Sequence, residues 1–304
     1  MNSLLKVSII IPTYGRPDTL SVAVDSCLNQ TYSPIEIIVV DDNNPDTESR
    51  HLTEQIMERY RDDDRVKYIR HICNKNGSAA RNTGFRNSTG DYIAFLDDDD
   101  YFYPTKIENQ VKRLNELSED YGVCYSKYET RYNGKIILTY RGHEEGEQLL
   151  YALMRNLFIA AGSNLLVKRH IIEEISGFDE SFNRNQDLEF LIRILQKYKL
   201  AYDNHLGLVV NAATTPRNTN YLEITEQFRK NFNPFISKLT ADEINKVNCV
   251  LDLQIFRYYL FSKKDLNSAI KHVKENKISL LTVFRYLVHL LKRFIRKSSE
   301  SFHI

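Results

Sequence analysis

The sequence predicts an α/β fold in which helices flank a mostly parallel sheet, followed by a helical C-terminal extension. Between residues 6 and 100, short apolar runs alternate with amphipathic stretches, a pattern typical of a parallel sheet covered by helices. Each of these runs is followed by a polar turn. Beyond residue 210 the pattern is mostly helical, and Lys and Arg outnumber Asp and Glu from residue 263 onward. We therefore expect an α/β domain over residues 1–210 and a helical region over residues 211–304.

Polar turns follow four predicted strands. The strands and their turns are Val7–Ile11 before Pro12-Thr13-Tyr14-Gly15-Arg16, Ile35–Val40 before Asp41-Asp42-Asn43-Asn44, Val66–Ile69 before Asn74-Lys75-Asn76-Gly77, and Tyr92–Leu96 before four aspartates. Because ligands of open α/β folds bind outside the carboxyl ends of the strands, the four turns predict one binding site. Asp18, Asp46 and Ser78 are expected to cap the helices that follow the turns.

The composition argues against several classes of function. A formal net charge of +1 over 304 residues, without an arginine-rich arm, predicts no nucleic-acid partner. Four cysteines, at positions 27, 73, 124 and 249, lack C-x-x-C spacing, so we expect no zinc site, no disulfide framework and a reducing cytoplasm. The first apolar run is too short for a signal peptide, and no segment is long and uncharged enough to cross a bilayer.

Residues 95–102, FLDDDDYF, place four carboxylates directly after an apolar run. Each close pair of like charges costs about a few kcal/mol near a protein surface. One interpretation is a solvated acidic turn that caps a helix beginning near Pro104. The other is a cation site, because Mg²⁺ and Mn²⁺ bind through one or two carboxylates together with substrate phosphates. We expect a divalent ion to supply the counter-charge.

The other turns predict a nucleotide ligand, although not a dinucleotide. The first strand is not followed by G-x-G-x-x-G, and the sequence contains no Walker motif. Arg16 and Arg81 suit phosphate groups or a base edge. Tyr14 suits stacking on a base, and Asp41 suits a base N–H or a ribose hydroxyl. Ordinary alternatives are a surface aromatic for Tyr14 and an ion pair with a nearby carboxylate for Arg81.

Four segments, in order along the chain, resemble the family 2 glycosyltransferases, which have the GT-A fold. They are VSIIIPTYGR at 7–16, IEIIVVDD at 35–42, GSAARNTGFRNSTGDYIAFLDDDD at 77–100 and GFDESFNRNQDLEF at 177–190. The resemblance implies that Asp97-Asp98-Asp99 is the D-x-D motif, with Asp99 on the metal and Asp97 or Asp98 near the ribose. It also implies that Asp41 and the turn Pro12-Thr13-Tyr14 hold the nucleoside. Asn43-Asn44-Pro45 departs from the family's usual Gly-Ser after the second strand.

A catalytic base is expected on a helix spanning residues 184–199. Asp187 shares one face of this helix with four apolar residues: Phe190, Leu191, Ile194 and Leu195. Asp187 is therefore predicted to point inward, whereas Glu189 is spaced to pair with Arg193 on the outer side. The family's motif here is Glu-Asp, and Gln186-Asp187 retains the aspartate that the resemblance implies is the base. Burial raises a carboxyl pKa, which suits removal of a proton from an acceptor hydroxyl.

These features together predict a metal-dependent glycosyltransferase that uses Mn²⁺ or Mg²⁺. The resemblance implies inversion at the anomeric carbon, a UDP-sugar donor, and a glycan or lipid-linked acceptor in bacterial surface polysaccharide synthesis, at the cytoplasmic face of the cell membrane. The alternative is a protein that binds a nucleotide sugar without turnover. A phosphoacceptor signalling module is excluded because the chain is too long and its acids follow the wrong strands.

The last predicted helix, over residues 278–297, is amphipathic. Its apolar stripe consists of Ile278, Leu281, Phe284, Leu287, Val288, Leu291, Phe294 and Ile295. The basic residues on its other side are Arg285, His289, Lys292, Arg293, Arg296 and Lys297. Such a helix contacts either an anionic membrane surface, or the catalytic domain or a partner through ordinary packing, and the sequence leaves both interpretations open.

Overall fold

The computed structural model describes residues 5–140, 142–182, 184–212 and 220–303. The chain divides into two compact units: unit 1 is Met1–Glu147 with Ile159–Ala212, and unit 2 is Gln148–Phe158 with Ala213–Ile304. Within unit 2, the Gln254 side chain donates to the Met154 carbonyl at 2.9 Å, which ties the first of its segments to the second. The predicted boundary at residue 210 places Gln148–Phe158 in the α/β domain, whereas these residues belong to unit 2.

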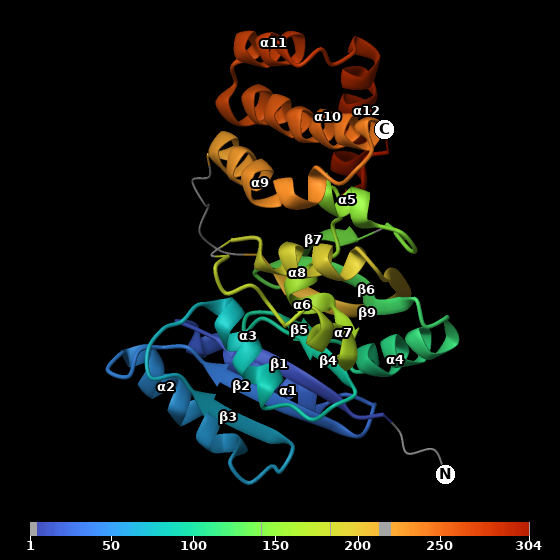
Figure 1. Cartoon of the computed structure of the whole chain (residues 1–304). Helices are drawn as coiled ribbons and strands as arrows, with labels where there is room; N and C mark the ends of the chain where they lie inside the picture. Colours follow the sequence, from blue (N-terminus) through green and yellow to red (C-terminus); the bar gives the residue numbers. More distant parts are fainter. Residues whose placement is uncertain (1–4, 141, 183, 213–219, 304) are drawn as a thin grey trace. The chain divides into compact units, whose positions relative to one another are not determined.

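Four parallel strands form one half of the sheet in unit 1 (Figure 1). They are β1 (Val7–Thr13), β2 (Ile35–Asp41), β3 (Val66–Arg70) and β4 (Tyr92–Phe95), in the spatial order β4-β1-β2-β3. Val7 pairs with both Ile35 and Tyr92, so β1, β2 and β4 begin in register and run toward the same edge. These three strands read as nearly continuous apolar runs because both faces of a parallel sheet are buried, whereas the edge strand β3 is partly exposed. The predicted shared edge is confirmed.

The other half of the sheet is mixed. β6 (Tyr121–Tyr132) pairs antiparallel with β8 (Leu166–Lys168) and β7 (Lys135–Tyr140), and β8 pairs antiparallel with β4. β9 (Lys199–Asn211) runs parallel to β6 and antiparallel to β5 (Tyr101–Phe102). β5 follows the four aspartates directly, so β9 is brought to the acidic turn.

The helices of unit 1 begin where the polar turns end. They are α1 (Pro17–Leu28), α2 (Glu48–Met57) with the short 3₁₀ turn Glu58–Tyr60, α3 (Gly77–Arg86), α4 (Lys106–Glu116), α6 (Ala161–Asn164), α7 (Arg169–Glu174) and α8 (Gln186–Leu195). α8 is shorter than the predicted helix over 184–199, because residues 196–198 turn the chain into β9.

The predicted helix caps are wrong by one or two positions. Thr47 caps α2 by accepting from the Arg50 N–H at 3.2 Å, and Asn76 caps α3 by accepting from the N–H groups of Ser78 and Ala79. α1 begins at Pro17 without a side-chain cap, and Asp18 lies in its first turn. A cap must precede the first turn so that its side chain reaches the free N–H groups, and Asp18 and Ser78 are already helical.

Unit 2 is helical, as predicted. It contains α5 (Leu149–Leu153), α9 (Tyr221–Ile236), α10 (Ala241–Arg257), a π-helical turn (Tyr258–Lys263), α11 (Leu266–Glu275), α12 (Leu280–Arg296) and the two-residue strand β10 (Ser298–Ser299). α10 begins with a capping box between Thr240 and Glu243 and buries eight of its side chains. Among the described residues, no helix is both long and apolar enough to cross a membrane.

Candidate active site

The strand ends of unit 1 surround a cavity of about 340 Å³. Six of the predicted site residues line it: Pro12, Thr13, Tyr14, Arg16, Arg81 and Asp97. The remaining lining residues are Asp42, Asn74, Asn76, Gly77, Ala80 and Gln186. The cavity is therefore lined by the turns after β1, β2 and β3, by the acidic turn after β4, and by the first residues of α3 and α8.

The four aspartates after β4 point toward different partners, so they do not repel one another as an isolated run would. Asp97 accepts from Arg81 at 2.5 Å, and Arg16 pairs with both Asp98 (2.7 Å) and Asp99. The sequence assigned the counter-charge to a divalent ion, whereas the structure shows that two arginines supply positive charge at the turn. Adjacent carboxylates become tolerable when each has its own cation or donor.

Asp98 and Asp100 are the buried members of the run. Asp98 also accepts from the Tyr14 backbone N–H at 3.3 Å, and Asp100 accepts from the Ser163 hydroxyl and the Asn211 N–H at 2.6 and 2.9 Å. Burial raises the pKa of Asp98 to about 6, against the opposing charge of Arg16. Burial, reinforced by the negative charge of Asp97, raises the pKa of Asp100 to about 8.

Three carboxylates of the run form a candidate metal site. Asp97, Asp99 and Asp100 each present an oxygen within 4.8 Å of the other two. Oxygen ligands from carboxylates are those that Mg²⁺ and Mn²⁺ prefer, so the donor set fits the predicted ion. Asp98 is not part of this group, because its carboxylate turns toward Arg16 and the backbone of the β1 turn.

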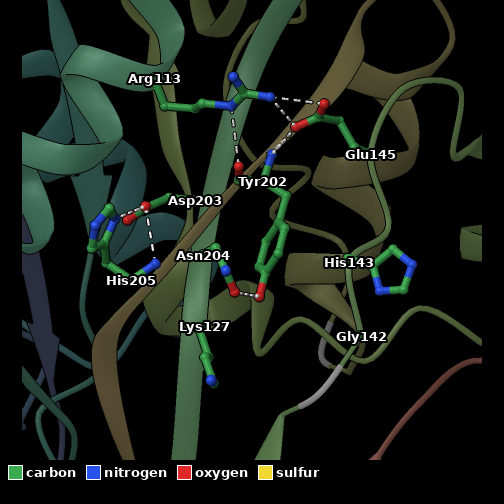
Figure 2. A pocket seen from close by; sticks show the side chains of 9 residues that line it. All are labelled: Arg113, Lys127, Gly142, His143, Glu145, Tyr202, Asp203, Asn204 and His205. Atoms are coloured by element: carbon green, nitrogen blue, oxygen red, sulfur yellow. Dashed lines mark hydrogen bonds and ion pairs between the residues drawn. The ribbon is translucent and has the colours of Figure 1, made fainter.

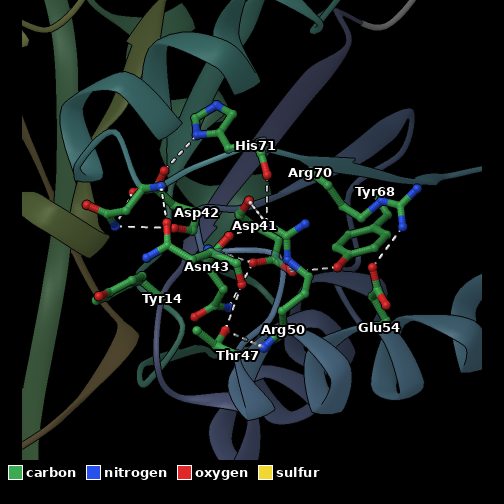
Figure 3. A network of polar contacts seen from close by, with 12 residues as sticks. Tyr14, Asp41, Asp42, Asn43, Thr47, Arg50, Glu54, Tyr68, Arg70 and His71 are labelled. Atoms are coloured by element: carbon green, nitrogen blue, oxygen red, sulfur yellow. Dashed lines mark hydrogen bonds and ion pairs between the residues drawn. The ribbon is translucent and has the colours of Figure 1, made fainter.

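Asp41 does not line the cavity, although it belongs to the predicted nucleoside site. It is fully buried, its Oδ1 accepts from the backbone and side-chain nitrogens of Asn43 at 2.9 and 2.8 Å, and its Oδ2 accepts from the Tyr68 hydroxyl at 2.5 Å (Figure 3). The Arg50 guanidinium lies 3.0 Å from the same Oδ2. Both carboxylate oxygens are thus engaged by the protein itself.

Asp42, the residue that follows Asp41, does line the cavity. Asp42 accepts from the side chain of Asn74 and from the backbone N–H groups of Lys75 and Asn76, at 2.8–3.0 Å, and lies 2.7 Å from a ring nitrogen of His71. This carboxylate therefore shapes the wall that the turn after β3 contributes. Sequence reasoning missed Asp42, Asn74 and Asn76 as lining residues, although all of them lie in the polar turns that it singled out.

Asp187 lies in the first turn of α8, next to Gln186, which reaches toward Arg81 at 3.4 Å. Burial raises the pKa of Asp187; the positive charge of Arg81 opposes the shift and the negative charge of Asp97 adds to it. Asp187 itself is not among the residues that line the cavity, whereas its neighbour Gln186 and the charged groups Arg81 and Asp97 are.

Glu189 corrects one prediction about this helix. Its pairing with Arg193 is confirmed, with contacts of 2.5 and 2.8 Å, but Glu189 is buried and Asp187 is only half-buried. The prediction that Glu189 lies on the outer side of the helix is therefore wrong. The salt bridge satisfies its charge, and Arg193 also donates to the Ile175 carbonyl at 2.5 Å, which ties the last turn of α8 to the end of α7.

Aromatic packing places α8 beside the acidic turn. The rings of Phe178 and Phe190 stack at 4.0 Å, and both meet the edge of Phe95, the last residue of β4, at 5.1 and 5.7 Å. Gly177, at φ +74°, precedes this cluster, and a Cβ there would lie 2.5 Å from Asn82. The turn before α8 therefore contributes packing at the start of this helix. Asn183, within the fourth family segment, lies outside the described residues.

A larger cavity, about 730 Å³, lies elsewhere in unit 1, between α4, β6, β9 and residues 142–145 (Figure 2). β9 bulges there, since Asp203 pairs with Ser126 but Leu206 pairs with Lys127. His205, in the bulge, lies 2.7 Å from Asp203, and His143 is exposed. Neither histidine lines the cavity at the acidic turn.

Comparison with known proteins identifies the family. The sequence model described as Glycosyl transferase family 2 matches residues 8–176. This chain belongs to that family. An uncharacterized glycosyltransferase of Rickettsia typhi is 32% identical over 250 residues, which are 78% of this chain and 74% of that protein. A match to a longer Rickettsia bellii glycosyltransferase, 30% identical, covers 79% of this chain and only 35% of that protein.

Further relatives carry more specific names. The E. coli protein WfaP, named UDP-Glc:alpha-D-GlcNAc-diphosphoundecaprenol beta-1,3-glucosyltransferase, is 40% identical over 122 residues, 40% of this chain and 45% of that protein. The structure of S. aureus TarS 1–349 with UDP-GlcNAc matches 96% of this chain and 81% of that chain, with a TM-score of 0.65 at 18% identity. The mannosyltransferase PcManGT of Pyrobaculum calidifontis, with GDP-Man and Mn²⁺, matches 97% and 85%, with a TM-score of 0.60 at 16% identity. The predicted GT-A architecture of this family 2 glycosyltransferase is confirmed.

Proposed function

We propose that this family 2 glycosyltransferase transfers a sugar from a UDP-sugar to a hydroxyl of a glycan or lipid-linked acceptor. The observation that carries the proposal is the cavity at the strand ends, where Arg16, Arg81 and Asp97 meet the start of α8. Arginines beside a carboxylate cluster suit a diphosphate whose negative charge is shared between guanidinium groups and a metal ion. WfaP is named for UDP-Glc and the TarS structure contains UDP-GlcNAc, which supports the choice of nucleotide.

The nucleoside is assigned to the side of the cavity formed by the turns after β1 and β2. Tyr14 is 55% exposed, so its ring is available for stacking on a base, and Pro12 and Thr13 line the same wall. Of the two adjacent acids after β2, we assign the nucleoside-facing role to Asp42 because it lines the cavity. Its oxygens also accept from the protein, so a nucleoside would contact it beside the turn after β3. Asp41 supports that wall from behind through Arg50, which donates to the His71 carbonyl at 2.8 Å.

The diphosphate and a divalent ion are assigned to the acidic turn. Asp97, Asp99 and Asp100 would hold Mn²⁺ or Mg²⁺, with Asp98 turned toward the β1 turn. When bound, the ion neutralises the negative charge that develops on the departing nucleotide diphosphate. Arg16 and Arg81 line the same cavity and would bind the phosphate oxygens.

The transfer is proposed to be a single displacement. The acceptor oxygen attacks the anomeric carbon while its proton passes to the Asp187 carboxylate, the bond from that carbon to the diphosphate oxygen breaks, and the configuration inverts. The raised pKa of Asp187 makes its carboxylate a stronger base than an exposed aspartate. No protein nucleophile is needed, because the groups that bind the donor also stabilise the leaving diphosphate.

We assign the reaction to the cytoplasmic face of the cell membrane. The support is chemical: WfaP is named for an acceptor carried on diphosphoundecaprenol, a membrane lipid. The acceptor of this chain is accordingly proposed to be lipid-linked.

A nucleotide-release screen tests the proposal. Purified full-length chain is incubated with UDP-, GDP- and dTDP-sugars and with Mn²⁺ or Mg²⁺, and free nucleotide diphosphate is measured over time. Metal-dependent release from one UDP-sugar is expected, because water replaces the acceptor slowly. Binding of UDP-sugars without release, in the presence of lipid-linked glycan acceptors, would identify a non-catalytic binding protein instead, and absence of binding to every donor would overturn the proposed site.

A further inference from the structure

Most of the apolar stripe of α12 faces solvent, whereas an ordinary core helix would bury it. Of the predicted stripe, Ile278 is buried before the helix begins, and Leu287 and Val288 are half-buried. Five residues of the stripe are between 58% and 82% exposed: Leu281, Phe284, Leu291, Phe294 and Ile295. Their spacing of three, four and seven residues places them on one side of the helix, which we call the outward face of α12. Single exposed apolar residues are common in proteins, but a contiguous row of large ones marks an interaction site.

The opposite side of α12 holds the helix onto unit 2. Tyr286 is buried with its ring 5.1 Å from that of Phe302, and the ring of His289 lies 5.4 Å from the same phenylalanine. The Arg293 guanidinium lies 4.5 Å from the ring of Phe158. Within unit 2, α12 therefore packs through the side opposite to the five exposed residues.

Basic residues border the outward face. Arg285, Lys292 and Arg296 follow Leu281 at intervals of four, seven and four residues, so they form a row along one edge of the face. All three are exposed. Leu280–Arg296 contains no Asp or Glu, although Glu300, just beyond the helix, lies 3.7 Å from the Arg296 guanidinium. A basic amphipathic helix is typical of a segment that contacts an anionic membrane surface or an acidic partner.

We propose that the outward face of α12 is a membrane-docking surface that lies flat in the headgroup region of an anionic bilayer. At 1.5 Å per residue, its 17 residues extend for about 25 Å parallel to the membrane plane. The Leu, Phe and Ile side chains enter the acyl boundary, while the row of Arg285, Lys292 and Arg296 meets lipid phosphates. Charge complementarity favours anionic lipid over a second copy of the chain, because two such rows would repel each other.

This surface belongs to unit 2 and is independent of donor and turnover. Binding to vesicles is measured without nucleotide, so failure of the docking proposal and failure of the proposed transferase reaction are distinguishable.

The test is co-sedimentation of the full chain with vesicles of phosphatidylglycerol and phosphatidylcholine in equal parts. Phe284→Gln combined with Phe294→Gln should weaken binding at least about tenfold, because each aromatic ring no longer leaves water. The matched control is Ile72→Gln combined with Phe261→Gln, which changes two equally exposed apolar residues away from α12 and should leave binding unchanged. Since all four side chains are largely exposed, the variants should fold.

A second variant tests the charge row. Removing Arg285, Lys292 and Arg296 together, each to Gln, should weaken binding to anionic vesicles by about fivefold per charge and abolish the preference over pure phosphatidylcholine. The control replaces the exposed Lys238, Lys264 and Lys274 of the same unit by Gln. Equal sedimentation of the Phe variant and the wild-type chain would overturn the proposal. A second outcome would also overturn it: a lower mass of the Phe variant than of the wild-type chain, measured by light scattering without lipid. The outward face of α12 would then join two copies of the chain.

Discussion

Replacing Asp41 by Asn should destabilise unit 1 by about 3 kcal/mol while changing nucleotide affinity by less than about threefold. Asp41 is fully buried, and its Oδ2 faces the Arg50 guanidinium at 3.0 Å and the Tyr68 hydroxyl at 2.5 Å. Asn keeps Oδ1, which accepts from Asn43, but presents an NH₂ group to Arg50 and Tyr68. A buried guanidinium then loses its counter-charge.

The magnitude follows from how Arg50 is otherwise solvated. Breaking a buried ion pair from one side costs about 3–5 kcal/mol. Arg50 also donates to the backbone carbonyls of Asn43 and His71, which keeps part of its charge solvated and places the cost at the lower end of this range. Tyr68→Phe removes only one neutral donor and should cost about 1 kcal/mol.

Urea unfolding followed by circular dichroism measures the effect. For a unit of this size, a slope of about 2–3 kcal/mol per molar urea converts the loss into a midpoint lower by about 1 M. Calorimetric titration with UDP and Mn²⁺, at low urea, measures affinity. Asp42→Asn is the matched control, since the same chemical change on the cavity wall should weaken UDP binding at least about tenfold.

The double variant Asp41→Asn with Arg50→Gln completes the cycle. It should be more stable than the sum of the single losses predicts, because no unpaired charge remains. An Asp41→Asn variant that unfolds at the wild-type urea concentration but loses UDP affinity would refute the reasoning, and would return Asp41 to the nucleoside site.

Three further predictions concern the site and the core. Asp187→Asn should lower kcat at least about a hundredfold with UDP-sugar affinity nearly unchanged, because it removes the base but not the donor contacts; Asp179→Asn, an exposed acid before the same helix, is the control, and wild-type turnover by Asp187→Asn would exclude it as the base. Chelation with EDTA should lower sugar transfer at least about a hundredfold, Mn²⁺ should restore it, and Asp99→Asn should reproduce the loss; transfer that persists in EDTA would remove the metal from the mechanism. Burial lowers the pKa of Lys106 to about 7, whereas a lysine in the unfolded chain titrates near about 10.4. Between these two values the unfolded state binds more protons than the folded state. The free energy of unfolding should therefore rise with pH between about 7 and 10. Lys106→Met lacks this dependence, so the stability of the wild-type chain relative to the variant should increase by up to about 1.4 kcal/mol per pH unit across that window; urea curves whose difference is constant with pH would show that the buried amine does not titrate there.

The sequence alone determined that the strand ends share one edge of the sheet and that the acidic run lies at that edge. Parallel strands must present their carboxyl ends at one edge, so apolar runs followed by polar turns were enough to bring Tyr14, Arg16 and Asp97 to one cavity. Four family segments then indicated the GT-A fold. These conclusions depend on order and spacing, which a sequence contains directly.

The tertiary structure decided which of two adjacent groups faces the ligand and which faces the core. The sequence predicted Asp41 for the nucleoside site. Both Asp41 and Asp42 are buried, and only the packed structure shows that Asp42 lines the cavity while Asp41 faces Arg50 and Tyr68. Helical periodicity likewise predicted which apolar residues of α12 share one side of the helix. It could not predict which side is buried, because the residues that cover it come from distant segments. Phe158 and Phe302 occupy the other side of that helix. Periodicity fixes a side chain relative to its own element, and only the contacts of distant residues fix it relative to water.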